Sequence, residues 1–257
     1  MSDITKRLGY GGSADIAGVQ VLITSGSLDT SLNVSYLEPL DLPPSTTRRS
    51  RIKHADGTAA YNGSLSFDVT EPFLDVLTVF TLLQRFYEFD IGINDGDDSY
   101  AMSACKLTSL SLSGSPGGLI TASISFSSIY SRSSSPILND YILDSANIPL
   151  GYWWSGNTAV RDWSFSMNQP VTPMYRNENL TTPSYLKVGL VSYSLAATTY
   201  TDISSSLINI ATKSFTLTGD TTSNAYSYGG QTDLGTFSHT FETAAVASAG
   251  SDGIIIV

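Results

Sequence analysis

The clearest pattern of apolar and polar positions lies between Lys106 and Phe126. Leucine, isoleucine and phenylalanine alternate there with serine and threonine on both sides of a turn that contains Gly114 and Pro116–Gly118. Successive side chains of a β-strand point to opposite faces, so this alternation places apolar groups on one face and hydroxyls on the other. The stretch predicts a β-hairpin with one buried face and one face of small hydroxylated residues.

A similar pattern near the end of the chain predicts a second hairpin. Lys213–Gly219 begins like the first hairpin, Gly229 and Gly230 supply a glycine pair, and Leu234–Phe241 alternates as a return strand. Two similar hairpins predict that one structural unit is used twice. The alternative is that Ser/Thr-rich hairpins resemble each other by chance.

Alternation predicts further strands, and clusters of Gly, Pro, Asn and Asp separate these strands from one another. These strands are Val19–Thr24, Leu32–Leu37, Tyr61–Val69, Val160–Met167, Tyr185–Tyr200 and Leu207–Ala211. Turns are predicted at Gly26–Thr30 and Asn94–Asp98, and a long loop at Asn168–Ser184. The acidic residues of Asn94–Asp98 do not have the spacing of an EF-hand calcium loop, which favours a hairpin turn.

One helix is predicted, over residues 71–87. Thr70 is a typical N-cap, and the acidic residue and proline that follow it suit a first helical turn. The apolar residues from Phe73 to Tyr87 form one broad stripe at helical spacing, which we expect to pack against the sheet. Residues Phe86–Ile93 fit either the end of this helix or a new strand.

Two segments are candidates for contacts between subunits. Residues 38–58 predict a long loop, because its three prolines are incompatible with regular strand pairing. The loop carries a basic cluster of Arg48, Arg49, Arg51 and Lys53, which we expect to meet carboxylates of a neighbouring subunit; a solvated loop and nucleic-acid binding are the alternatives. The C-terminal residues Ile254, Ile255, Ile256 and Val257 favour pairing with a sheet edge, in a neighbouring subunit or in the same domain.

Composition favours an all-β fold (a β-sandwich or barrel) with one flanking helix. Only 14% of the 257 residues are charged, and Ser and Thr take their place. The chain is long enough for one large or two small domains. The predicted division is an arm over residues 1–18 that is Gly-rich, a first β-domain over 19–147 and a similar second β-domain over 148–257. The formal net charge of -10 disfavours wrapping of nucleic acid, which depends on Lys and Arg.

The residues of catalytic and metal chemistry form no recognisable pattern in this sequence. The single cysteine, Cys105, excludes an intramolecular disulfide, and the histidines His54 and His239 lack zinc-site spacing. Nucleophile-elbow, P-loop and dinucleotide-binding motifs are absent. We therefore expect neither enzymatic activity, nor a cofactor, nor a metal. The N-terminus lacks the apolar segment of a secretory signal, and no apolar run is long enough for a membrane anchor.

The order of these elements resembles the tail-tube proteins of tailed bacteriophages. The resemblance rests on Val19–Val69 with its basic stretch, the helix after Thr70 and the hairpin Ser109–Phe126. In the second half it rests on Val160–Tyr175 and Pro183–Leu195. The chain is also similar to the secretion-system tube proteins that share that fold.

This resemblance implies a structural protein of the virion that forms homo-oligomeric rings and is made in the cytoplasm of a host bacterium. The rings would stack into a hollow tube, contact other tail proteins and let DNA pass without specific binding. Six chains would form a ring, or three if each chain holds two tube domains.

Two groups of alternatives remain open at this point. One is a related ring-forming tail component, such as a distal, terminator or baseplate protein. The other is a carbohydrate-binding β-sandwich, with Tyr152, Trp153 and Trp154 as its platform, or a capsid decoration protein.

Overall fold

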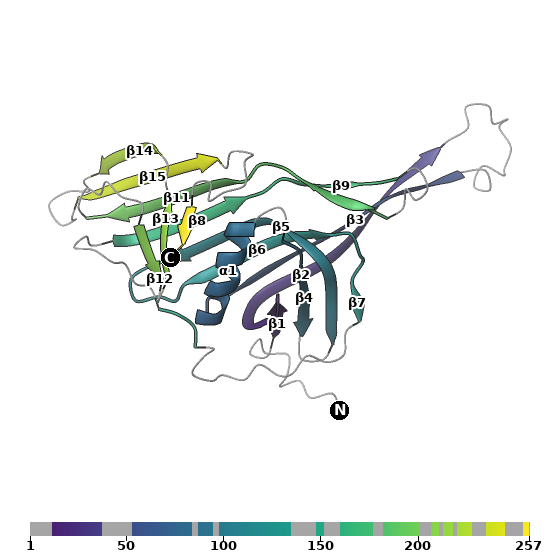
Figure 1. Ribbon diagram of the computed structural model, residues 1–257, viewed down its shortest axis with the longest axis horizontal. Helices are drawn as coiled ribbons and strands as arrows, with labels where there is room; N and C mark the ends of the chain where they lie inside the picture. Colours follow the sequence, from purple (N-terminus) through teal and green to yellow (C-terminus); the bar gives the residue numbers. More distant parts are fainter. Residues whose placement is uncertain are drawn as a thin grey trace, which may run out of the picture.

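The computed structural model describes residues 12–37, 53–83, 87–94, 98–134, 148–151, 160–176, 182–200, 207–210, 213–217, 220–227, 235–244 and 254–256. The fold is all-β with one helix, as the sequence predicts (Figure 1). The first half contains β1 (Ser13–Ile16), β2 (Val19–Leu37), β3 (Lys53–Asp68), α1 (Glu71–Leu83), β4 (Phe89–Asn94), β5 (Ser99–Gly114), β6 (Thr121–Ser128) and β7 (Ser133–Ser134). The second half contains β8 (Val160–Asn168), β9 (Val171–Met174), β10 (Tyr185–Val188), β11 (Ser192–Thr199), β12 (Leu207–Ile210), β13 (Lys213–Leu217), β14 (Asp220–Ser227), β15 (Thr236–Ala244) and β16 (Ile254–Ile256).

Six antiparallel strands of the first half close into a barrel, in the order β5-β4-β1-β2-β3-β6 and back to β5. The predicted hairpin is confirmed, because Leu110 of β5 faces Ile124 of β6 and both side chains are buried. The ladder between β4 and β5 ends with Asn94 facing Ser99, as a hairpin turn at this place requires. Alternation therefore identified β5 and β6 correctly.

Strand β5 belongs to the barrel and also to an open sheet. Its first part pairs with β4, and further along the same edge Ser109–Gly114 pairs with β8. From there the sheet continues through β11 and β15 to β14. The strands β12, β13 and β16 form a separate small sheet, whose central strand β13 contacts β11 and β15 (Figure 1).

Helix α1 packs its apolar stripe against the core of the barrel. Phe73 meets Phe67 of β3 at 4.7 Å between ring centroids, and Phe80 meets Phe89 of β4 at 4.8 Å. All four rings are buried, as expected for an amphipathic helix that covers a sheet. The helix is shorter than predicted: it ends at Leu83 within the described residues, and Tyr87 is not helical. The chain re-enters the sheet at Phe89, which decides the alternative for Phe86–Ile93 in favour of a strand.

Two further predictions for the first half are wrong. The proposed arm over residues 1–18 includes β1, which pairs with β2 on one side and β4 on the other and whose Ser13, Ala14 and Ile16 are fully buried. The turn at Gly26–Thr30 is absent, and β2 runs straight through it. Gly26 faces Leu65, and a Cβ there would lie 2.6 Å from Leu65 Cδ2, so close packing rather than a turn accounts for this glycine.

The loop over residues 38–58 is also shorter than predicted. Its last residues belong to β3, where Lys53 faces Leu37 and Thr58 faces Asn33. Strand pairing with β2 thus overrides the polar composition of this segment. The remainder, 38–52, lies outside the described residues.

The second half differs from its prediction in how its strands pair. The Lys213 segment does not form a hairpin with Leu234–Phe241: β13 pairs with β12 and β16, whereas β15 pairs with β14 and β11. The predicted loop at Asn168–Ser184 contains β9, and the predicted strand Tyr185–Tyr200 is divided into β10 and β11. Among the described residues this half extends the sheet of β5 and closes no barrel of its own. The division into two equivalent tube domains stays a prediction.

Candidate assembly surfaces

A long two-stranded ribbon projects from the barrel (Figure 1). Strands β2 and β3 stay paired from Ile23 and Phe67 at the barrel out to Leu37 and Lys53. Strand β6 accompanies β3 only from Tyr61 to Asp68, so in the described part of the chain the outer half of the ribbon has no further strand along its edges. A two-stranded ribbon is only marginally stable alone in water, which makes this half a candidate for contacts with another molecule.

The second half of the chain braces the ribbon at one point. The hydroxyl of Tyr175, which follows β9, donates a hydrogen bond of 2.5 Å to the carbonyl of Ala59. Ala59 is 3% exposed and lies just beyond the last β3 residue that pairs with β6. The hairpin of β9 and β10 therefore fixes the direction in which the ribbon leaves the barrel.

The predicted contact residues are only partly covered by the described residues. Arg48, Arg49 and Arg51 lie outside the described residues, between the far ends of β2 and β3, and Lys53 begins β3. Ile254, Ile255 and Ile256 form β16, which pairs with β13 of the same chain, whereas Val257 lies outside the described residues. Of the two pairings predicted for this segment, the structure has the one within the chain. The contact of these residues with a neighbouring subunit stays a prediction.

The sheet carries two rows of small hydroxylated residues that run across β2, β3, β6, β5, β8 and β11. Register places Ser25, Ser66, Ser123, Ser111, Ser166 and Ser194 side by side in the first row. It places Ser27, Ser64, Ser125, Ser109, Asn168 and Ser192 in the second. We call these two rows the hydroxyl rows. None of their side chains is charged.

Neighbouring side chains in and beside the hydroxyl rows bind one another. Ser66 donates to Ser123 at 3.3 Å, the hydroxyls of Ser27 and Ser64 lie 3.2 Å apart, and those of Ser113 and Thr121 lie 2.9 Å apart. A hydroxyl both donates and accepts, so serines on adjacent strands can bind each other, and Ser27 also donates to the Asp29 carboxylate at 3.0 Å. The face is thus polar without charge.

The charges next to the hydroxyl rows are mostly acidic. On β15, Glu242 faces Ser194 and is exposed. Asp68 faces Thr121, and burial raises the pKa of its carboxyl group above the usual range. The base nearest to the rows along β5, Lys106, has a side chain only 9% exposed and is held by Glu88 at 3.1 Å. The face therefore offers little to attract a polyanion.

The sequence predicted the alternation that gives the hydroxyl rows but not the rows themselves. A row forms only when strands far apart in the sequence align with their serines in register, as Ser111 does with Ser123 on one side and Ser166 on the other. The repeated Ser-X-Ser pattern in several strands was the available signal.

An acidic cleft of about 560 Å³ lies where β1, β4 and β5 meet. Each of its carboxylates has a partner within the chain. Asp15 accepts from the amide of Gly18 at 2.8 Å, and Asp90 accepts from the amide of Ala104 at 3.0 Å. Glu88 is paired with Lys106 at the distance given above. Within the described residues no group of three or more His, Cys, Asp and Glu side chains is placed to hold a metal ion.

Cys105 and His239 are both buried. Cys105 is fully buried and donates to the carbonyl of Met102 at 3.3 Å; burial, and to a lesser degree the charge of Asp90, raises the pKa of its thiol to about 12. His239 is 1% exposed and lies 3.2 Å from the hydroxyl of Thr199. The proposed carbohydrate platform, Tyr152–Trp154, lies outside the described residues.

Comparison with known proteins gives no assignment. No protein-family model matches the chain, and no curated protein matches it either. In the part of the chain that the structure describes, no helix has both the length and the apolar character needed to cross a membrane.

Proposed function

We propose that this chain is a structural protein of a phage tail that assembles into stacked rings around a channel for DNA. The observation that carries the proposal is the pair of hydroxyl rows. DNA binds proteins chiefly through Lys and Arg, whose contacts displace counterions from the phosphates. A broad sheet face of Ser and Asn bordered by acidic residues suits a wall along which DNA moves without being held.

The projecting ribbon supports the assembly part of the proposal. Its outer half has unpaired edges in the described region, and in the sequence Arg48, Arg49 and Arg51 fall between the end of β2 and Lys53, with which β3 starts. A neighbouring subunit would cover these edges and supply carboxylates. Each exposed ion pair contributes only about 0.2–1 kcal/mol, so the contact would depend on repetition around a ring.

Electron microscopy of the purified protein tests the assembly directly. We expect rings or short tubes by negative stain, and a native mass that gives three or six chains per ring. Stacking should weaken as salt rises above about 0.1 M, because the pairs are exposed. Replacement of all four basic residues by serine should leave the subunit folded and reduce stacking. A monomer at tens of micromolar, also in the presence of other tail proteins, would refute the proposal.

A second experiment tests the role of the hydroxyl rows. The triple variant Ser111→Lys, Ser166→Lys and Ser194→Lys should still form rings, but these rings should retain double-stranded DNA in a salt-dependent manner. The matched control is Thr172→Lys, since Thr172 is exposed on β9 and belongs to neither row. If the triple variant and the control retain DNA equally, the rows do not line the channel.

A ring at another position of the tail, such as a distal, terminator or baseplate ring, is the second candidate. The observation that favours it is the open sheet of the second half, which continues β5 within the described residues instead of forming another barrel. Long tubes of the protein alone would support the tail tube, whereas single rings that bind the end of a tube would support this alternative.

A further inference from the structure

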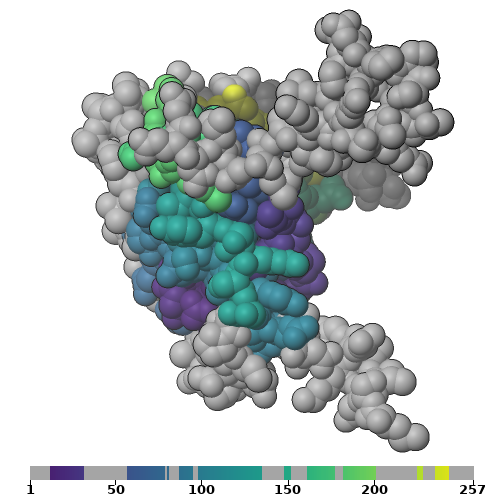
Figure 2. Space-filling model, turned by 90° about the vertical axis from the view of Figure 1, so that its right-hand side faces the viewer, coloured from purple at the N-terminus to yellow at the C-terminus, as the bar shows by residue number. Residues whose placement is uncertain are grey.

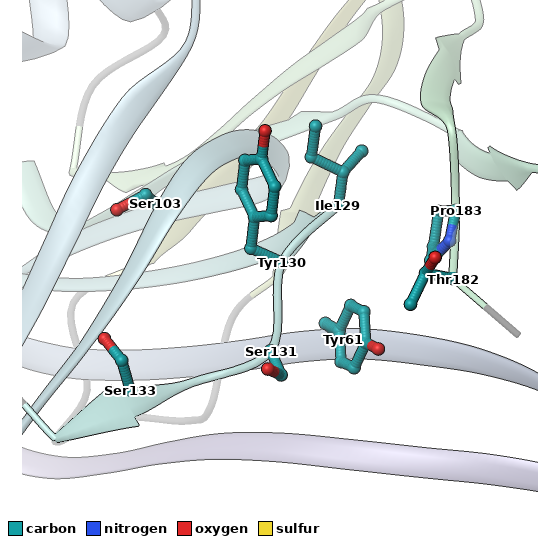
Figure 3. A pocket seen from close by; sticks show the side chains of 8 residues that line it. All are labelled: Tyr61, Ser103, Ile129, Tyr130, Ser131, Ser133, Thr182 and Pro183. Carbon is teal, nitrogen blue, oxygen red and sulfur yellow. The ribbon is translucent and has the colours of Figure 1, made fainter.

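We propose that a pocket at the base of the ribbon binds a neutral sugar ring. The pocket has a volume of about 540 Å³ and lies between β3, β5, the segment after β6 and the residues before β10 (Figure 3). Its position is separate from the hydroxyl rows, and the inference does not depend on the proposed function. The volume falls within the range of about 300–1,000 Å³ that is typical of small-molecule sites.

The lining of the pocket combines aromatic rings with hydroxyls, and no charged side chain is among the described residues that line it. Tyr61 and Tyr130 supply the rings, and Ser103, Ser131 and Thr182 supply hydroxyls from different elements (Figure 3). The ring of a sugar has an apolar face of C–H groups that packs on an aromatic side chain, and its hydroxyls both donate and accept hydrogen bonds. The lining offers partners for both properties and no charge that would select a phosphate or a carboxylate.

The one basic residue beside this segment is directed elsewhere. Arg132 lies over the ring of Tyr100, 5.2 Å from its centroid, and its guanidinium is 3.5 Å from the carbonyl of Leu28. It is not among the residues that line the pocket. An anionic ligand would therefore have no positive partner among the described residues of the lining.

A buried serine anchors the backbone of the segment that carries Tyr130. Ser128, which is 1% exposed and faces Tyr61 across the ladder, accepts a hydrogen bond from the amide of Tyr130 at 2.8 Å. Its own hydroxyl donates to the carbonyl of Ser103 at 2.6 Å. Ser128 thus joins the segment that carries Tyr130 to β5, and the pocket is formed before any ligand binds.

The ring of Tyr130 is accessible to a ligand. Tyr130 is 58% exposed, whereas Tyr61 is only 7% exposed and forms the floor. Figure 2 shows the molecule from the side toward which the ribbon points, with the segment that follows β6 (teal) on the surface beside residues of the first strands (purple). A sugar at the end of a surface glycan could therefore reach the pocket.

Saturation-transfer NMR with glucose, galactose and N-acetylglucosamine at about 10 mM tests the proposal, with glucuronic acid as the charged comparison. We expect transfer to the ring protons of at least one neutral sugar and less to glucuronic acid. Tyr130→Ala should weaken binding about tenfold, since it removes the stacking surface. Ser131→Lys should also weaken it by filling the pocket, and Tyr226→Ala, at a tyrosine 60% exposed on β14, should not.

Three results would overturn the proposal. One is no transfer to any neutral sugar, and another is transfer that Tyr130→Ala and Ser131→Lys leave unchanged. The third is a wild-type protein that associates through this face, so that Tyr130→Ala lowers the native mass without any effect of sugar. That outcome would identify the pocket as a contact site for a segment of another protein chain.

Discussion

Replacement of Gly63 by alanine tests how closely the barrel strands pack. Gly63 of β3 faces Phe126 of β6 on the inner side of the barrel. A Cβ at this position would lie 2.6 Å from Cε2 of Phe126 and 2.7 Å from the carbonyl oxygen of Ser27. Both distances are shorter than real Cβ contacts, so the ring or the β2 backbone must move.

Neither neighbour of Gly63 moves easily. Phe126 is 1% exposed and packs edge-on against Phe89 at 6.2 Å between centroids, and Ser27 is held in the ladder opposite Ser64. Overpacking of a filled core costs about 1–3 kcal/mol. For a chain of this length that loss corresponds to a fall in Tm of about 3–10 °C.

Thermal unfolding followed by circular dichroism, together with urea unfolding, measures this change. Gly151→Ala is the matched control: a Cβ at Gly151 meets no atom within 4 Å, so its Tm should stay unchanged or rise slightly. Gly26→Ala should be intermediate, because its Cβ meets the flexible end of Leu65. If Gly63→Ala is as stable as Gly151→Ala, Phe126 does not pack over β3 and the reasoning about the barrel core is wrong.

Three further predictions concern single side chains. Tyr175→Phe should accelerate amide exchange in the outer half of β3 with a loss of about 1 kcal/mol, because the bond to Ala59 is removed; unchanged exchange would show that Tyr175 is no brace. Cys105 should resist thiol reagents at pH 8 in the folded protein and react in urea, since its thiol pKa is about 12; rapid reaction of the folded protein would contradict its burial. Burial raises the pKa of Asp68, so its negative charge opposes folding at neutral pH. This penalty disappears at a pH below the usual pKa of a carboxyl group, where Asp68 is protonated in both the folded and the unfolded chain. Asp68→Asn should therefore raise Tm at pH 7 and not at pH 3.

Local sequence patterns correctly predicted the elements whose conformation depends on residues close together in the sequence. The hairpin from Lys106 to Phe126, the start of the helix after Thr70 and the strand at Val160–Met167 agree with the structure. Alternation at period two and an N-cap act within a few residues, so the sequence contains their whole cause. The predicted strand boundaries were wrong where pairing with a distant strand sets them. For example, β3 begins at Lys53 because β2 lies beside it.

Long-range pairing could not be predicted from such patterns. Strand β1 is only four residues long, and its place between β2 and β4 depends on the closure of the barrel. Similarly, β13 resembles the start of the first hairpin but pairs with β12 and β16. Ser/Thr-rich strands with alternating apolar residues suit many partners, and their choice depends on tertiary packing that the local sequence does not specify.

The bulge in β5 explains how one strand serves both the barrel and the open sheet. Its ladder with β6 shifts between Leu107 and Ser109, and Gln169 binds the strand at this place. The backbone N–H of Gln169 donates to the carbonyl of Thr108 at 2.7 Å. Its side-chain Nε2 donates to the carbonyl of Leu107 at 3.1 Å. A bulge bends its strand and changes the direction of the residues beyond it. Past the bulge, β5 leaves β4 and pairs with β8, which brings Ser111 and Ser166 into one row.

The two surfaces that the proposed function requires should respond differently to salt. The hydroxyl rows contain no charged side chain, and most of their hydrogen bonds join neutral hydroxyls; the exception is Ser27, which also binds the Asp29 carboxylate, so their structure should respond little to ionic strength. A contact through Arg48, Arg49, Arg51 and Lys53 would instead weaken as salt increases. Rings that persist in high salt while their stacks come apart would place the basic cluster between rings. Rings that come apart together with the stacks would place it within a ring, and the ribbon would then join neighbours side by side.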